Sequence, residues 1–157
     1  MLFKDVIADF LHHVRHGLNL TPNTIRVYRS WLGVFQRWAD EEQVPANLDL
    51  RFTTPVLRRF MYSCSKKGLK ARTIHNVFAP MKALAGFCIQ NGMLTDDPCA
   101  ALQLPKKEAP YRPLATDQEL AALLAATERQ SDPRRVARDR AMLSVLVYCG
   151  VRFQELL

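Results

Sequence analysis

The sequence predicts an all-α protein: a four-helix bundle, then a linker and a smaller helical unit. Apolar residues recur three or four positions apart in several separate segments, which is the spacing of one helix face, and almost no segment alternates as a strand does. Thr-Pro or Asp-Pro pairs, which are typical of helix starts, precede three of these segments. A proline-rich stretch at residues 105–113 then interrupts the pattern and separates the bundle from the rest of the chain.

The first two helices of the bundle are marked by their apolar faces and their ends. Residues 3–14 carry apolar side chains at 3, 6, 7, 10, 11 and 14, and Gly17 is placed to end this helix. Thr21 is expected to cap the second helix, with Pro22 at its first position, where the missing N–H costs nothing. This helix should end near residues 40–42, before Pro45.

The third and fourth helices complete the bundle over residues 1–105. Thr54-Pro55 repeats the signal of a cap followed by proline, and Gly68 is a natural stop for the third helix. The fourth helix covers about residues 71–90. Pro80 lies inside its pattern, so we expect a kink or a split there.

The remainder is predicted as a linker over residues 106–113 and a helical unit over residues 114–157. Thr116 and Glu119 form a capping-box signature, which starts one helix, and Asp132-Pro133 starts another that ends at Gly150. The apolar run 141–149 suits a buried helix. Because so few residues make a small core, we expect this unit to be a fragment, or to be completed by another chain.

The composition excludes several other classes of protein. Of the 157 residues, 48% are hydrophobic and 24% are charged, with 6 glycines and 9 prolines; this is neither disordered nor collagen-like. The longest apolar run is far shorter than the ~20 residues that span a bilayer, and residues 1–17 lack a signal-peptide core. We therefore expect no membrane partner and a cytoplasmic location.

Cysteine and histidine spacing predicts no metal and no cofactor. His12, His13 and His16 cluster in the sequence, but no cysteine or placed carboxylate accompanies them. The four cysteines form no C-x-x-C pair, and the chain is long enough to fold without a disulfide. They are read as reduced core thiols: Cys64, Cys88, Cys99 and Cys149.

Positive charge is concentrated in one part of the bundle. The formal net charge is +7, yet residues 50–95 contain no acidic residue at all. A stretch of one sign is typical of a surface that faces a polyanion such as a nucleic acid, although a solvated basic face without a partner remains the alternative. The basic residues of this stretch are Arg51, Arg58, Arg59, Lys66, Lys67, Lys70, Arg72 and Lys82.

An ordered series of motifs resembles the tyrosine recombinases of the phage integrase family. The segment LTPNTIRVY at 20–28 resembles the opening of the family's core-binding domain, and TIHN at 73–76, MKAL at 81–84, NG at 91–92 and DP at 97–98 follow in order. LATDQEL at 114–120, RDRAML at 138–143 and YCGVRFQEL at 148–156 resemble the start of the catalytic domain. Lys70 departs from the family, since a serine-like cap usually precedes the fourth helix.

The resemblance implies a SAM-like core-binding bundle that binds double-stranded DNA in recombination and integration, with no small-molecule substrate. A homo-oligomer on DNA is also implied. The second and fourth helices would lie against the major groove, and the linker would cross the backbone. The residues assigned to DNA on this basis are Asn23, Thr24, Arg26, Arg29, Lys66, Lys67, Lys70, Arg72, His75, Asn76, Lys82, Lys106, Lys107 and Arg112.

The resemblance assigns one catalytic residue, Arg152. The family's active site uses a first arginine, a lysine on a β-hairpin, a histidine–arginine motif, a further His or Trp and a nucleophilic tyrosine. Only the first arginine has a counterpart here, so no strand cleavage is expected from this chain alone. The alternative for Arg152 is a structural pairing with Glu155 or a carbonyl. Tyr148 is not expected to be the nucleophile, since it lies in the apolar helix.

A different class of function stays open. The chain could be a helical protein-interaction module that a partner chain completes. Apolar surface expected around Leu143, Leu146, Leu156 and Leu157 favours this alternative, whereas the basic stretch favours DNA.

Overall fold

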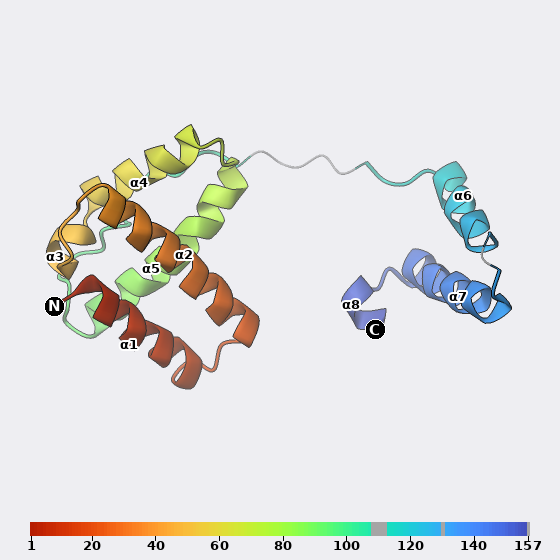
Figure 1. Cartoon of the computed structure of the whole chain (residues 1–157), viewed down its shortest axis with the longest axis horizontal. Coiled ribbons are helices and arrows are strands. Elements are labelled where there is room, and N and C mark those ends of the chain that lie inside the picture. The colour runs from red at the N-terminus through yellow and green to blue at the C-terminus, as the bar shows by residue number, and fades with distance from the viewer. Residues whose placement is uncertain (108–112, 130, 157) are drawn as a thin grey trace. The chain divides into compact units, whose positions relative to one another are not determined.

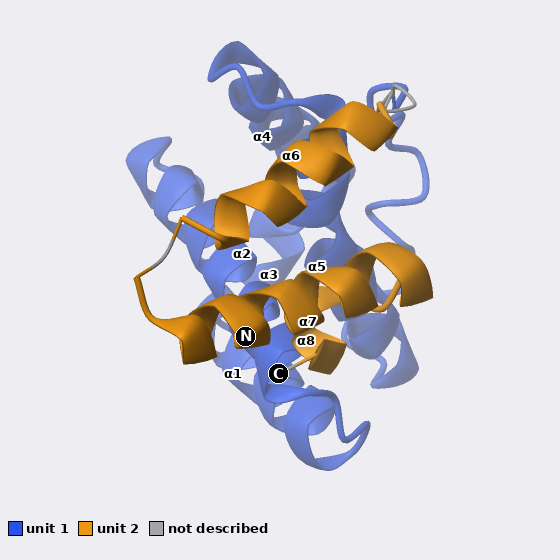
Figure 2. Cartoon of the chain, turned by 90° about the vertical axis from the view of Figure 1, so that its right-hand side faces the viewer, with its two compact units in different colours: residues 1–109 blue, residues 110–157 orange. Residues whose placement is uncertain are grey.

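The computed structural model describes residues 1–107, 113–129 and 131–156, and in these ranges it is helical with no strand. The chain divides into two compact units, Met1–Ala109 and Pro110–Leu157, which Figure 2 shows in two colours. The division falls inside the predicted linker, of which residues 108–112 lie outside the described residues. The expected all-α class is confirmed.

Unit 1 is built from four long helices and one short one. The long helices lie where the sequence predicts them, whereas the short α3 was not predicted because four residues give no periodic pattern. Figure 1 shows α1 beside α2, running in opposite directions, with α5 crossing them. The helices are α1 (Phe3–His16), α2 (Pro22–Glu41), α3 (Leu48–Arg51), α4 (Thr54–Lys66) and α5 (Ala71–Gln90).

The core of unit 1 gathers around α5, which packs against α1, α2 and α4. Aromatic rings link these helices. The Phe35 ring centroid of α2 lies 5.5 Å from that of Phe3 and 5.1 Å from that of Phe60. Phe10 of α1 stacks on Tyr28 of α2 at 5.9 Å and meets Phe87 of α5 at 5.6 Å. Such pairs add about 0.5–1.5 kcal/mol each beyond their burial, so the surface faces of α1, α2 and α5 are held in a fixed register.

One local prediction for unit 1 is corrected, and of the two alternatives at Pro80, a kink or a split, the split is excluded. The cap of α4 is Thr53 rather than Thr54; the Thr54 hydroxyl instead donates to the carbonyl of Pro98 at 2.9 Å and ties α4 to the segment after α5. Pro80 does not split α5, which is one helix. Pro80 is itself buried in the core, and packing on both sides of it offsets the lost backbone hydrogen bond.

Unit 2 contains α6 (Asp117–Thr127), α7 (Pro133–Cys149) and α8 (Phe153–Leu156). The predicted capping box of Thr116 and Glu119 is present, and Gly150 ends α7 with a φ of +62°. The expectation that residues 141–149 form a buried helix is wrong, because α7 has no buried residue. Among the described residues of unit 2, α6 and α8 pack on α7. Leu143, Leu146 and Leu156 are half-buried and Tyr148 is exposed, while Leu157 lies outside the described residues.

The cysteines divide between the two units. Cys64, Cys88 and Cys99 are buried free thiols, as predicted, and burial raises the pKa of Cys88 to about 11 and that of Cys99 to about 12. Cys149 is exposed, which corrects its assignment to the core. Among the described helices, none combines the length and the apolar character that crossing a membrane requires.

Candidate nucleic-acid interface

Four candidate DNA-binding residues occupy the first turns of α2. The helix starts where Thr21 caps it, since the Thr24 backbone N–H donates to the Thr21 hydroxyl oxygen at 3.3 Å. Arg26 donates from Nη2 to Asn23 Oδ1 at 2.6 Å, and both side chains are exposed. Arg29 follows one turn later and is also exposed. A helix N-terminus carries partial positive charge, so these groups add to a field that attracts anions.

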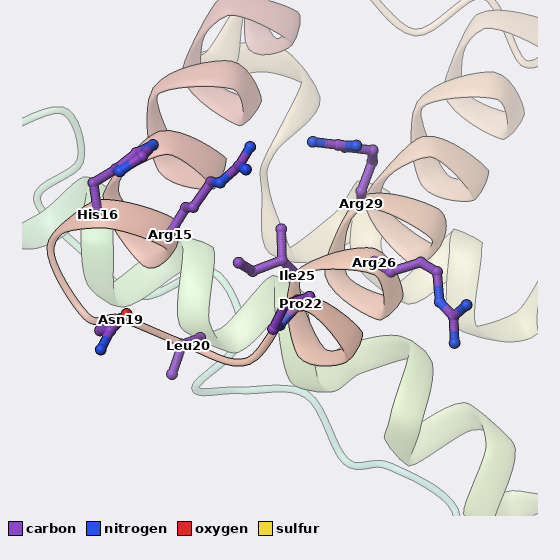
Figure 3. A pocket seen from close by; sticks show the side chains of 8 residues that line it. All are labelled: Arg15, His16, Asn19, Leu20, Pro22, Ile25, Arg26 and Arg29. Atoms are coloured by element: carbon purple, nitrogen blue, oxygen red, sulfur yellow. The ribbon is translucent and has the colours of Figure 1, made fainter.

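A pocket of about 450 Å³ lies where the end of α1 meets the start of α2. In Figure 3 the guanidinium groups of Arg15 and Arg29 extend into the same space from two helices, while Arg26 points away. No carboxylate lines this α1–α2 pocket, whose residues are Arg15, His16, Asn19, Leu20, Pro22, Ile25, Arg26 and Arg29.

Sequence reasoning missed three polar members of this pocket: Arg15, His16 and Asn19. The signal that could have found them is their position. Arg15 and His16 end the helix that immediately precedes α2, and a short connection makes the two helices antiparallel neighbours. Asn19 in that connection has a φ of +49°, a left-handed conformation that asparagine tolerates better than most residues.

A second group of candidates surrounds the turn between α4 and α5. Gly68 has a φ of +77°, which lets the chain reverse direction after α4. Lys66, Lys67, Lys70 and Arg72 are all exposed around this turn. Lys70 takes the N-cap position of α5, where its ammonium group, which has no acceptor, cannot cap the helix, and no ion pair with a described carboxylate holds it.

The candidate DNA-binding residues on the outward face of α5 differ in how exposed their side chains are. Asn76 and Lys82 are exposed, whereas His75 is half-buried and its Nε2 lies 3.0 Å from the carbonyl oxygen of Pro105. That hydrogen bond holds the segment after the bundle against α5. Lys82 lines a hollow of about 260 Å³ together with Leu20, which also lines the α1–α2 pocket.

Among the described residues, the candidate cations have no carboxylate partner, a property they share with Arg37 and Arg58 but not with Arg51 and Arg59. None of the described candidates forms an ion pair with a described carboxylate, so their charge is available to an external anion. Arg51 and Arg59, from the same acid-free stretch, are each 2.7 Å from a carboxylate of α2 or its C-terminal cap. The described candidates are Arg26, Arg29, Lys66, Lys67, Lys70, Arg72, Lys82, Lys106 and Lys107; Arg112 lies outside the described residues.

Arg152 lies between α7 and α8 and is paired with Glu155. Its Nη1 is 2.8 Å from one oxygen of that carboxylate, and its backbone N–H donates to the other at 2.8 Å. The backbone hydrogen bond first, and the side-chain one second, lower the pKa of Glu155 from its ordinary value. The Arg152 side chain is still 85% exposed, so the guanidinium keeps donors for another oxyanion.

Histidines form no metal site in the described part of the chain. The rings of His12 and His16 lie 4.6 Å apart on one face of α1. No group of three described His, Cys, Asp or Glu side chains is arranged to hold a metal ion.

Comparison with known proteins gives a consistent set of matches. A family model described as the phage integrase N-terminal SAM-like domain matches residues 7–92. A tyrosine recombinase XerD from Pseudomonas aeruginosa is 30% identical over 151 residues, covering 96% of this chain and 49% of the relative. A tyrosine recombinase XerC from Psychromonas ingrahamii is 27% identical over 153 residues, covering 98% of this chain and 50% of the relative. The chain thus spans about half the length of these curated relatives. No solved structure matches it significantly.

Proposed function

The chain belongs to the phage integrase family, whose N-terminal SAM-like domain it carries, and we propose that this domain binds double-stranded DNA in site-specific recombination. The observation that carries the proposal is the set of exposed cations without carboxylate partners on α2, on α5 and at the turn before α5. Unneutralised cations on neighbouring helices suit the phosphates of a duplex, because each phosphate contact releases bound counterions.

Phosphates and base edges would be contacted by different residues. Arg26, Arg29, Arg72 and Lys82 supply charge for the backbone, as do the lysines beside Gly68. Asn76 is exposed on α5, and an asparagine amide can pair with an adenine edge in the major groove. Asn23 and Thr24 would offer further polar groups from α2, while His75 would act mainly through its bond to Pro105.

The segment that follows Pro105 would also contact DNA. Lys106 and Lys107 are exposed directly after Pro105, which the hydrogen bond from His75 holds against α5. We expect these lysines, with Arg112, to bind backbone phosphates where the chain leaves the bundle.

Arg152 is proposed to bind phosphoryl oxygens at the site of strand exchange. A planar guanidinium can donate to two oxygens at once, which suits the charge that develops on phosphorus in such a reaction. Glu155 holds the backbone and the side chain of Arg152, so its role is to position the arginine. Because these 157 residues contain only this member of the catalytic set, we expect DNA binding from them but no strand cleavage.

A second candidate function rests on unit 2. Leu123, Met142, Leu143, Leu146 and Phe153 line an open apolar hollow of about 330 Å³, a feature that suits contact with another protein segment. The two candidates differ in whether association needs DNA. Sedimentation velocity of the chain with and without a duplex separates them: oligomers that form only on DNA support recombination, and oligomers without DNA support an interaction module.

The deciding experiment is fluorescence anisotropy with a labelled mixed-sequence duplex over a salt series. If about six phosphates are neutralised, the slope of log affinity against log salt should be roughly −5. Micromolar binding with such a slope supports the proposal. Absence of binding at low salt would contradict it and leave the interaction module.

A further inference from the structure

We propose that the α1–α2 pocket is a binding site for one phosphodiester group of DNA, held between Arg15 and Arg29. The inference rests on the DNA-binding function proposed above and extends it, since it adds α1 to the helices that contact DNA. It makes Arg15 a DNA-binding residue, in addition to those that the sequence analysis assigned.

The first argument is electrostatic. Arg15 and Arg29 come from different helices and reach into the same space (Figure 3). Neither guanidinium has an ion-pair or hydrogen-bond partner among the described residues. Two cations that share a space without a carboxylate repel each other, so an anion between them removes an unfavourable interaction and gains two charge-assisted hydrogen bonds.

The second argument comes from the ends of the helices. Among the long helices, α1 and α6 have acidic residues in the first turn that complement the positive end of the dipole, whereas α2, α4, α5 and α7 have none. The first turn of α2 has no acidic residue, and Arg26 and Arg29 follow it instead. The positive end of α2 therefore lacks a complementary charge from its own helix, and it lines the same pocket through Pro22.

A purely structural role accounts for only part of this arrangement. Arg15 and His16 lie in the last turn of α1, where basic residues favour the negative end of the dipole. That explanation does not extend to Arg29, which is the eighth residue of α2 and lies beyond the terminal turns in which a helix dipole acts on its own side chains. The joint placement is what indicates a ligand.

The pocket is large enough and continuous with the proposed interface. Its volume of about 450 Å³ exceeds the ~30 Å³ share of one water molecule many times, so a phosphate enters with part of its hydration shell. Leu20 lines both this pocket and the hollow that contains Lys82 of α5. A phosphate held here would thus extend the contacts of α5 toward the end of α1.

The test compares two single variants of the whole chain by anisotropy over a salt series. Arg15→Gln, which changes the one residue that only this inference assigns to DNA, should weaken duplex binding several-fold and make the salt slope shallower. Lys4→Gln, which removes an exposed charge from the same helix outside the pocket, should change neither quantity appreciably. If the pocket variant binds like the wild type while the wild type binds DNA, this inference fails and the proposed function stands. If the wild type does not bind, both fail.

A measurement on the unaltered chain guards against misfolding of the variant. The Nε–Hε resonances of Arg15 and Arg29 should both shift on addition of duplex DNA, and unchanged resonances would overturn the inference. Inorganic phosphate is the comparison ligand. If it saturates these resonances while duplex DNA leaves them in place, the pocket takes a free phosphate and its assignment to DNA is wrong.

Discussion

The guanidinium of Arg51 lies 2.7 Å from the carboxylate of Asp40, with a side chain only 5% exposed against 58% for Asp40. Arg51 also donates from Nη2 to the carbonyl of Val44 at 2.6 Å and from Nε to that of Pro45 at 3.0 Å. Its side chain therefore supplies hydrogen-bond donors to two backbone carbonyls in the segment that connects α2 to α3. The charge of Arg51 serves the fold of unit 1 and does not face solvent.

Replacing Arg51 by alanine should lower the free energy of unfolding by roughly 2–4 kcal/mol, because the carbonyls of Val44 and Pro45 lose their donors. Urea unfolding followed by circular dichroism measures this change. Arg59→Ala is the matched control: its pair with Glu42 has the same 2.7 Å distance but is about half exposed on both sides, so about 1 kcal/mol or less is expected. If both variants lose the same free energy of unfolding, Arg51 does not stabilise the fold more than Arg59 does.

Charge counting along the sequence could not make this distinction. Arg51, Arg59 and Lys82 all belong to one acid-free stretch, yet the first two find carboxylates at the end of α2, which lies outside the stretch. Helix starts, by contrast, depend on neighbouring residues, so the caps at Thr21 and Thr116 were predicted correctly.

Features that need packing were missed or misplaced. Thr53 and Thr54 are equally suitable caps by sequence, and the bond from Thr54 to Pro98 decides between them only once the bundle has formed. The α1–α2 pocket depends in the same way on two helices meeting. The roles of the individual candidate DNA-binding residues stay predictions.

Thiol reactivity should single out Cys149. It is exposed, whereas Cys64, Cys88 and Cys99 are buried and have pKa values raised by desolvation, which leaves little of the reactive thiolate near neutral pH. Brief treatment of the native chain with iodoacetamide, followed by mass spectrometry, should therefore show one modification. Four are expected after denaturation, and none in native Cys149→Ser. Rapid modification of Cys88 or Cys99 in the native chain would show that the core opens.

The capping box should make α6 sensitive to acid. Hydrogen bonds from the backbone and then the hydroxyl of Thr116 lower the pKa of Glu119 from its ordinary 4.5. The stabilisation is thus complete above the unfolded pKa and is lost as the pH falls through the folded one. A carboxyl ¹³C titration should place the pKa of Glu119 below 4.5, and Thr116→Ala should move it upward. That variant should also destabilise α6 by about 1 kcal/mol through loss of the cap. If the pKa of Glu119 is the same in Thr116→Ala as in the wild type, the capping box does not form in solution.

Arg72 and Lys82 offer the sharpest test of the interface on α5. Both are exposed and have no described carboxylate partner, so Arg72→Ala/Lys82→Ala should weaken duplex binding and make the salt slope shallower by about two units, roughly 0.9 for each lost phosphate contact. Asn76→Ala, on the same helix, removes a polar group without removing charge. It should lower affinity or relax sequence preference while leaving the slope unchanged, because a base-edge contact releases no counterions. Anisotropy over the same salt series measures all three chains, with circular dichroism to confirm that each is folded. Wild-type affinity and slope in the double variant would remove α5 from the interface, even if the chain binds DNA elsewhere.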